Sequence, residues 1–168
     1  SEADVTEVVA KYWKNGIPVI VGDGTTYSQG NGIVVSVGDV YIVGVENGQA
    51  KYWRNGDPVI LQGGIDAYSI ALDGNDVYVT GRLDHPNYVA MYWKNANKVI
   101  LSESLNMETA TSIAVLDNNV YVAGTIVKYR PVFLRNFNNI VASWKNGGFD
   151  LITDGSKDAS VKCIFIDK

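Results

Sequence analysis

The stretch Ala50-Lys51-Tyr52-Trp53-Arg54-Asn55-Gly56-Asp57-Pro58-Val59-Ile60 returns, with few changes, in three other parts of the sequence. The copies are Ala10-Lys11-Tyr12-Trp13-Lys14-Asn15-Gly16-Ile17-Pro18-Val19-Ile20, Ala90-Met91-Tyr92-Trp93-Lys94-Asn95 and the more divergent Ala142-Ser143-Trp144-Lys145-Asn146-Gly147. The four tryptophans are therefore 40, 40 and 51 residues apart. Internal similarity at a fixed period indicates a repeat architecture in which each unit packs against its neighbours.

The repeated stretch has the pattern of a β-hairpin. In the copy around Trp53, a short run of aromatic and charged residues leads to Asn55-Gly56, and an apolar run that contains Pro58 follows. Asn-Gly favours the positive φ angles of a two-residue hairpin turn. Because proline cannot donate to a central ladder, the run that contains it is expected to form an outer edge strand.

A second hairpin pattern lies between the tryptophan stretches. Residues 68–81 and 111–124 each hold two runs rich in Val, Ile and Tyr around a turn of Asp, Gly and Asn, and residues 31–44 repeat this pattern around Val37-Gly38-Asp39. β-Branched and aromatic residues are enriched in strands, and Gly, Asn and Asp in tight turns. Each repeat of about 40 residues is therefore predicted to contain four strands.

Four strands per repeat predict an all-β protein with a single domain at residues 1–168. A period near 40 residues is typical of β-propeller blades, so the chain is expected to form a propeller of about four blades. The expected strands, from the inner to the outer one, are 31–36, 39–45, 50–54 and 58–62 in one blade, 67–73, 76–82, 88–94 and 98–102 in the next, and 110–116, 119–127, 139–145 and 149–153 in the third.

The order of the two hairpins resembles that in propellers of the NHL type, where an Ile-Ala-Val strand precedes a Val-Tyr-Val strand. The Tyr-Trp-Lys-Asn-Gly motif is similar to the repeats of uncharacterised secreted or lipid-anchored bacterial proteins, and the similarity covers nearly the whole chain. It implies a propeller that is extracellular, periplasmic or on the cell surface. Ser1-Glu2-Ala3-Asp4 lacks the basic and apolar regions of a signal peptide, so such a location requires that a signal has been removed.

The two ends of the sequence carry complementary parts of one blade. Residues 159–166 match an inner strand, and Asp4-Val5-Thr6-Glu7 stands where the second strand would precede the third and fourth at residues 10–21. One blade is therefore expected to be shared between the N- and C-termini, which would leave fewer free strand edges. Only eight residues separate Asp4 from Tyr12, against thirteen between Asp39 and Tyr52, so the second strand of this blade is expected to be short or missing.

Several closures are compatible with this pattern. The four blades can close within one chain, or two chains can join as half-rings into an eight-bladed homodimer. An open arc or another all-β arrangement is the remaining alternative.

The composition excludes several classes of function. The 168 residues carry a net charge of −4, and the 14 Lys and Arg are scattered, so no nucleic-acid partner is expected. A single cysteine, Cys163, cannot form an intrachain disulfide, and no histidine or thiol cluster predicts a metal site. No apolar run is long enough to span a membrane, and no motif predicts a cofactor.

Candidate ligand-binding residues lie in the loops that differ between repeats. The turns around Gly38, Gly74-Asn75 and Asn55-Gly56 should share one rim of the propeller, and the variable connections should form the opposite rim, which we call the variable rim. Variable loops on a rigid scaffold are where recognition usually resides. The insertion at 128–138 interleaves Arg with aromatic residues that can stack on a glycan, a peptide or an anion. The candidates are Tyr129, Arg130, Phe133, Arg135, Phe137, Asp84 and His85; the alternative for the insertion is packing on a neighbouring blade or subunit.

The tryptophans are expected to pack between blades and not to form a sugar-binding platform, because they occupy the same position in every repeat. His85, the sole histidine, has no nearby nucleophile or second ligand in the sequence and is expected in a surface loop. The Asp-rich segments 22–25 and 154–158 lack the spacing of a calcium loop, and Asp-Gly turns explain them.

The sequence therefore predicts a protein that is not an enzyme. The favoured function is a non-catalytic binding module that presents its rim loops to a glycan, a peptide or a surface protein. One alternative is a structural or assembly component of a secreted protein. Another is a glycan hydrolase or lyase that uses carboxylates such as Asp84, Asp154 and Asp158, although no pair can be placed at the separation that glycosidases need.

Overall fold

The fold is all-β, as predicted from the sequence. The computed structural model describes residues 8–83, 89–102, 107–127 and 138–167, which contain fourteen strands and no helix. Among these residues there is consequently no helical segment capable of crossing a lipid bilayer.

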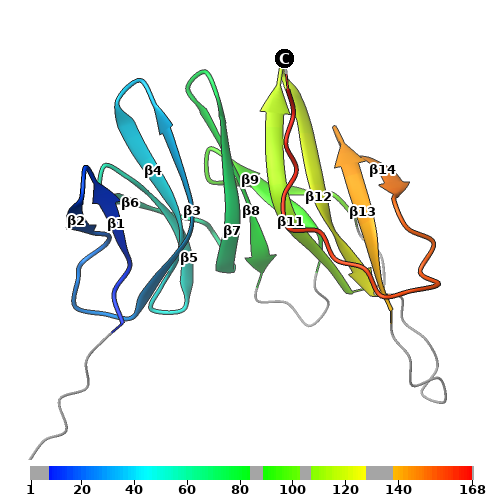
Figure 1. The fold of residues 1–168 in the computed structure, drawn as a ribbon, viewed down its shortest axis with the longest axis horizontal. Coiled ribbons are helices and arrows are strands. Elements are labelled where there is room, and N and C mark those ends of the chain that lie inside the picture. The colour runs from blue at the N-terminus through cyan, green and yellow to red at the C-terminus, as the bar shows by residue number, and fades with distance from the viewer. Residues whose placement is uncertain (1–7, 84–88, 103–106, 128–137, 168) are drawn as a thin grey trace, which may run out of the picture.

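The strands form one two-stranded hairpin and three four-stranded antiparallel sheets (Figure 1). The N-terminal hairpin consists of β1 (Lys11–Lys14) and β2 (Ile17–Ile20). The first sheet consists of β3 (Ser28–Ser36), β4 (Asp39–Glu46), β5 (Gln49–Arg54) and β6 (Asp57–Ile60). The second consists of β7 (Gly64–Asp73), β8 (Asp76–Leu83), β9 (Met91–Lys94) and β10 (Asn97–Ile100). The third consists of β11 (Met107–Leu116), β12 (Asn119–Val127), β13 (Asn139–Lys145) and β14 (Gly148–Leu151).

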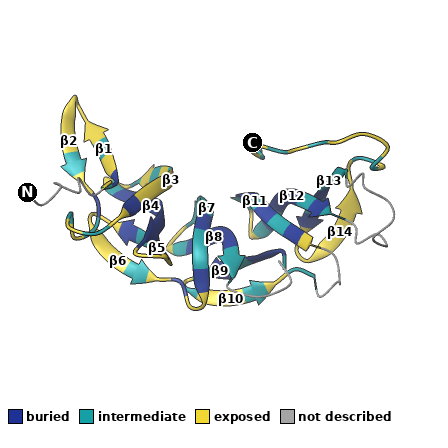
Figure 2. Cartoon of the chain, turned by 90° about the horizontal axis from the view of Figure 1, so that it is seen from below, coloured by how far each residue is buried: buried dark blue, intermediate teal, exposed yellow. Residues whose placement is uncertain are grey.

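The sheets follow one another along an arc that is open on one side (Figure 2). In each sheet the strands are paired in chain order, and the first strand is the innermost one. The inner strand β7 contacts both β3 and β11, so the inner strands stand next to one another along the arc. The N-terminal hairpin lies at one end of the arc, and the third sheet lies at the other.

The hydrophobic core is divided among the boundaries between sheets. Trp93 on β9 is fully buried in a cluster with Val43 of the preceding sheet and with Leu61, which directly follows that sheet. Trp144 packs in the same way against the second sheet, and Trp53 packs against the N-terminal hairpin. Sheets that bury one face against each neighbour form a repeat architecture with no single centre.

Trp13 is an exception to the predicted packing of the tryptophans. Its side chain is 66% exposed, whereas Trp53, Trp93 and Trp144 are at most 1% exposed. Each buried tryptophan packs on the sheet or hairpin that precedes it, and no described element precedes the N-terminal hairpin. The prediction is therefore confirmed for three tryptophans and wrong for Trp13.

The asparagine of the repeated motif links the two hairpins of each sheet. Asn55 adopts a φ of 53°, and its Oδ1 accepts a hydrogen bond of 2.9 Å from the amide of Val40, while its Nδ2 donates one of 2.7 Å to Asp39. Asn95 makes the equivalent bonds to Val77 and Asp76 in the second sheet. A third copy joins Asn146 to Val120 and Asn119. This asparagine clamp explains why the residue recurs in the motif.

Each inner strand contains a β-bulge close to the residue at which the strand was predicted to start. The registers shift at Gly30/Gly32, Ala67/Ser69 and Ala110/Ser112. Pairing continues beyond the bulge, so the inner strands start at residues 28, 64 and 107, three residues earlier than predicted. A bulge adds an unpaired residue and interrupts the alternation from which the strand starts were predicted.

The bulges also explain the glycine that ends the Val-Tyr-Val runs. A Cβ on Gly81 would lie 2.1 Å from the carbonyl oxygen of Asp66 and 2.7 Å from the ring of Trp93. Gly44 and Gly124 face the equivalent carbonyl oxygens of Gln29 and Thr109 at similarly short distances. Only glycine leaves room for the bulged strand at these positions.

The predictions for the chain ends have mixed outcomes. The third and fourth strands expected at residues 10–21 are β1 and β2. The second strand expected at Asp4–Glu7 lies outside the described residues. Residues 159–166 run beside β11 but form no strand (Figure 1), because a ladder needs a paired backbone partner.

Candidate functional site

The two rims of the arc differ as the sequence predicted. The asparagine clamp brings the two hairpin turns of each sheet together on one rim, which we call the turn rim. The remaining connections lie at the opposite ends of the antiparallel strands and form the variable rim. They range from the two-residue turn at Asn47-Gly48 to connections of six or more residues.

The predicted ligand-binding residues are outside the described part of the chain. Asp84 and His85 belong to the connection between β8 and β9, and the others to the connection between β12 and β13, namely Tyr129, Arg130, Phe133, Arg135 and Phe137. The site is therefore built from the described residues at the variable rim and along the inner strands.

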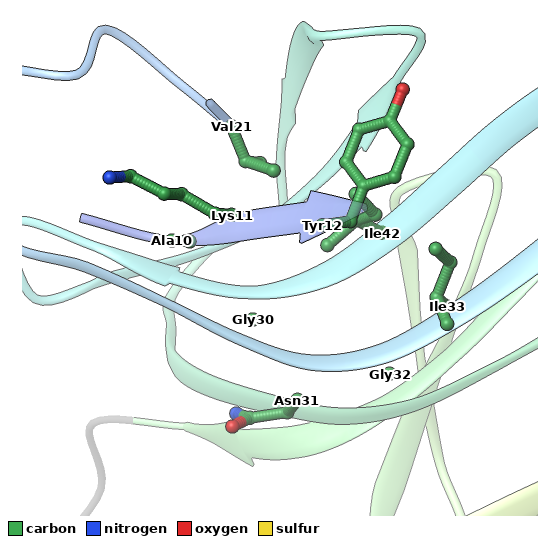
Figure 3. Close-up of a pocket in the computed structure, with 9 residues that line it drawn as sticks. All are labelled: Ala10, Lys11, Tyr12, Val21, Gly30, Asn31, Gly32, Ile33 and Ile42. Carbon is green, nitrogen blue, oxygen red and sulfur yellow. The ribbon is translucent and has the colours of Figure 1, made fainter. Parts of the chain in front are cut away.

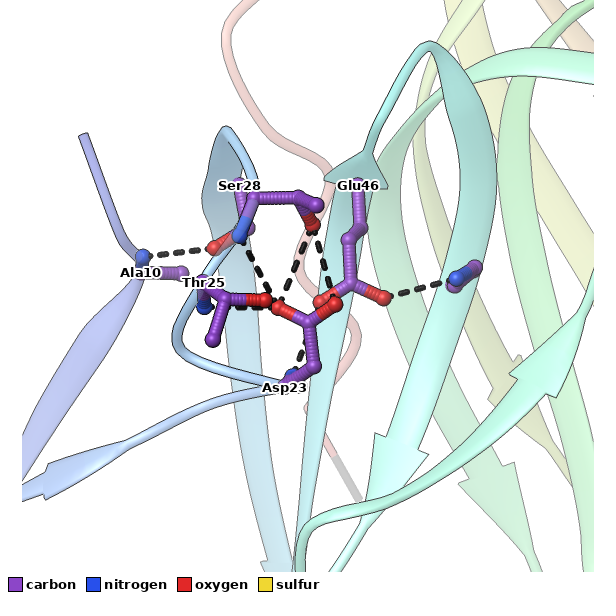
Figure 4. Close-up of polar contacts among 7 residues, drawn as sticks. Ala10, Asp23, Thr25, Ser28 and Glu46 are labelled. Carbon is purple, nitrogen blue, oxygen red and sulfur yellow. Dashed lines mark hydrogen bonds and ion pairs between the residues drawn. The ribbon is translucent and has the colours of Figure 1, made fainter. Parts of the chain in front are cut away.

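At the variable rim of the first sheet, a buried carboxylate holds the connection that leads into β3. Glu46 is only 5% exposed, and it accepts hydrogen bonds of 2.7 Å from Lys51 Nζ and 3.1 Å from the amide of Asp23 (Figure 4). A Cβ on Gly22 would overlap the carboxylate of Glu46, so glycine is required there. The Glu46–Lys51 pair thus has a structural role in the loop.

In the Asp-rich segments 22–25 and 154–158, an aspartate side chain accepts hydrogen bonds from backbone amides that follow it. Asp23 accepts hydrogen bonds from the amides of Thr25 and Thr26, and these bonds, led by that from Thr25, lower its pKa. Asp154 similarly caps the amide of Ser156, which lowers the pKa of its carboxyl. The described residues hold no group of three or more potential metal ligands. Both loops are Asx turns.

Asp158 holds the loop after β14 against the start of β13. Its carboxylate accepts bonds of 2.8 and 2.9 Å from the backbone and side-chain nitrogens of Asn139. The carboxylates of Asp154 and Asp158 are therefore engaged in hydrogen bonds that hold the loop after β14.

A line of exposed polar side chains runs along the start of the innermost strand. The hydroxyl of Tyr27 donates to Gln29 at 3.0 Å, Gln29 donates to Asn31 at 2.9 Å, and Asn31 donates to the carbonyl of Ala67 at 2.8 Å. Gln29 and Asn31 are exposed, and Tyr27 is 47% exposed. We call Tyr27, Gln29 and Asn31 the amide line.

The polar surface continues onto the second sheet. Asp66 occupies in β7 the register position of Gln29 in β3, and it forms an ion pair of 3.0 Å with Arg82. Both side chains are about one-third exposed. The amide line and this pair offer neutral donors and acceptors, an aromatic ring and two opposite charges along adjoining inner strands.

A pocket of about 220 Å³ lies beside the amide line, between the N-terminal hairpin and the first sheet (Figure 3). Ala10, Tyr12 and Val21 line it from the hairpin, and Asn31, Ile33 and Ile42 from the first sheet. At the boundary between the first two sheets, the corresponding space is filled by residues of the inner two strands, including Val34 and Val43. Among the described residues, the pocket therefore lies where no inner strand pair covers the first sheet.

A second hollow of about 440 Å³ lies on the turn rim between the second and third sheets. Lys94 stands 5.2 Å above the ring of Tyr78 and 2.7 Å from Asp76. The hydrogen bond from Lys94, followed by that from Asn95, lowers the pKa of the Asp76 carboxyl. The third sheet has Asn119 in place of Asp76, while Lys145 still lies over Tyr121.

The Asp76 carboxylate is expected to make stability depend on pH. Its pKa in the folded protein is below the ordinary 3.8, so its contribution is complete above that value and is lost as the pH falls through the folded pKa. Asp76→Asn should lower the melting temperature at about pH 6, and the gap from the wild type should close by about pH 2. The reverse change, Asn119→Asp, should add the same acid-sensitive contribution beside Lys145. A gap that stays constant across this pH range would contradict the assignment.

Comparison with known proteins adds no assignment. No family model matches the chain, and no curated protein matches it.

Sequence reasoning missed the amide line because the inner strand was predicted to start at Asn31. The signal was present as alternation, since Tyr27, Gln29 and Asn31 are polar and the intervening residues Ser28 and Gly30 are small. In a strand, residues two apart share one face, so this pattern would have extended the strand and placed the three side chains together.

Proposed function

We propose that the protein is a non-catalytic binding module of β-propeller architecture whose inner strands bind a neutral, hydroxyl-rich ligand, namely a glycan. The amide line carries this proposal. It presents amide groups that can both donate and accept, beside an exposed tyrosine ring. Sugar hydroxyls pair with such amides, and apolar sugar faces stack on aromatic rings.

Two features support binding over catalysis. The rim carboxylates Glu46, Asp154 and Asp158 are each engaged in hydrogen bonds to the surrounding loop. On the adjoining second sheet, Asp66 and Arg82 form an ion pair of 3.0 Å and so neutralise each other. A glycosidase instead needs two free carboxyl groups that flank a bond.

The propeller assignment rests on the sequential four-stranded sheets with their innermost first strands and on the arc that they follow. In this proposal, residues 159–166 and the N-terminal hairpin supply the inner and outer parts of one further blade. The resemblance of the repeats implies a secreted or cell-surface location for this module.

A glycan array followed by calorimetric titration tests the proposal. Gln29→Ala and Asn31→Ala should each weaken binding of the captured glycan by about tenfold or more, because each removes hydrogen-bonding groups from the site. Lys98→Ala, on the exposed outer strand β10, is the matched control and should bind normally. Unchanged binding by both amide variants would refute the site, and capture of peptides without any glycan would refute the ligand class.

A further inference from the structure

We propose that two copies of this chain join end to end, so that residues 159–166 of each copy complete the blade begun by the N-terminal hairpin of the other. This inference rests on the propeller architecture proposed above. It assigns an interaction surface to both ends of the arc, and the partner is a second copy of the chain.

Residues 159–166 already occupy the position of the next inner strand. The amide of Ile164 donates a hydrogen bond of 3.1 Å to the hydroxyl of Ser112 on β11. Between the second and third sheets, the amide of Ile113 donates in the same way to Ser69 at 3.4 Å. Ile164 follows Lys162-Cys163 as Ile113 follows Thr111-Ser112, so sequence and contact agree on the equivalence.

The segment turns one face to the third sheet and leaves the other uncovered. Ile164 and Ile166 are half-buried, whereas Cys163 is exposed and Phe165 is 83% exposed. Phe165 has the strand position of Val34, which packs in the cluster between the first two sheets. Phe165 therefore faces the space that a following sheet would fill.

The other end of the arc has the matching uncovered face. Ile33 and Val35 on β3 are 55% and 60% exposed. The residue of the third sheet that corresponds to Ile33 is Ile113, which is 4% exposed because it packs on the second sheet. The pocket lined by Ile33 and Tyr12 is adjacent to this face (Figure 3). An incoming inner strand that carries Phe165 would cover it.

A second complementary pair lies on the outer strands. Trp13 is 66% exposed at one end, and Ile152 is 62% exposed at the other. Ile152 corresponds to Leu61, since each donates its amide to the neighbouring third strand, and Leu61 is fully buried in the cluster that holds Trp93. Seating Trp13 of one copy on Ile152 of the other would repeat the internal contact.

The shape of the arc favours closure of the ring by a second copy over contact between the two ends of one chain. The N-terminal hairpin and the third sheet lie at opposite ends of the open arc (Figure 2). Two arcs related by a twofold axis bring each end against the complementary end of the other copy and close a ring of eight blades. Both copies then bury the same two faces.

A disulfide trap tests the pairing. Cys163 and the residue at Ile33 would face each other as Ser69 and Ile113 do within the chain. We expect Ile33→Cys, under mild oxidation, to form a disulfide-linked dimer with the native Cys163. The matched control, Ser69→Cys with Ile113→Cys in a Cys163→Ser background, should form the same link within one chain and so validates the geometry.

Once the control variant shows its disulfide, electrophoresis of the Ile33→Cys variant without reducing agent distinguishes the outcomes. A species of twice the chain mass supports the proposal, a cross-linked monomer overturns it in favour of closure within one chain, and the absence of a link also overturns it. Light scattering of the wild type should give about twice 18.3 kDa, and Trp13→Asp should reduce this to the single-chain mass.

The outcomes distinguish failure of this pairing from failure of the proposed glycan binding. A monomer whose glycan binding still depends on Gln29 would overturn only the pairing. A cross-linked dimer that binds no glycan would overturn only the ligand assignment.

Discussion

Replacing Trp93 by alanine is expected to lower the free energy of unfolding by about 3–5 kcal/mol. Trp93 has no exposed surface, and it fills the boundary between the first and second sheets with Val43, Leu61 and Met91. Its indole nitrogen also donates to the carbonyl of Gln62 at 3.3 Å. The neighbouring strands are fixed by their ladders, so they cannot collapse fully into the cavity.

Urea denaturation followed by circular dichroism measures this loss. Ile60→Ala is the control, because Ile60 lies on the outer strand β6 with 46% of its surface exposed, and it should cost less than about 1 kcal/mol. If Trp93→Ala cost as little as the control, the boundaries between sheets would not be the core of this protein.

Strand number and order were predictable from the sequence because two local signals recur. Alternating Val, Ile and Tyr side chains mark the inner hairpins, and Asn-Gly marks the outer ones, as at Asn55-Gly56. Both signals depend only on residues close together in the sequence, so they can be recognised without knowledge of the tertiary structure. The shared rim of the hairpin turns followed from antiparallel pairing alone.

The bulge in β3 and the exposure of Trp13 depend on longer-range geometry. The bulge at Asn31 results from how β3 pairs with β4, and a repeat pattern does not reveal it. The sequence around Trp13 matches that around Trp53, but their burial differs because, among the described elements, only Trp53 has a preceding one to pack against. Burial in a repeat protein is decided by neighbours, so identical motifs at an end and in the middle differ in environment.

The binding residues predicted in the connections lie outside the described residues, and the site proposed above uses different ones. Variable loops were chosen because recognition usually resides in them. Gln29 and Asn31 of the amide line instead lie on β3, where the backbone fixes the spacing of side chains, and Tyr27 directly precedes this strand. A site on a strand positions its hydrogen-bonding groups more exactly than a site on a loop.

Replacing Asn95 by alanine is expected to lower the free energy of unfolding by about 2–3 kcal/mol. The side chain accepts from the amide of Val77 at 2.9 Å and donates to Asp76 at 2.7 Å, and both bonds are lost. The amide of Val77 is then left without its acceptor in a partly buried place. Alanine must also adopt the φ of 50° that asparagine tolerates.

Asn15 provides the control, because it stands in the same turn of the N-terminal hairpin with a φ of 52°. Within the described part of the chain, its side chain has no hydrogen-bond partner, because β1 pairs only with β2 and no inner hairpin like that of β7 and β8 lies beside it. Asn15→Ala should therefore cost only the conformational term of about 1 kcal/mol, and the difference between the two variants measures the asparagine clamp. Equal losses would mean that the motif keeps asparagine for its backbone angle alone. A larger loss at Asn95 would show that the clamp joins the two hairpins of each sheet into one cooperative unit, which the sheet needs before it can pack on its neighbours.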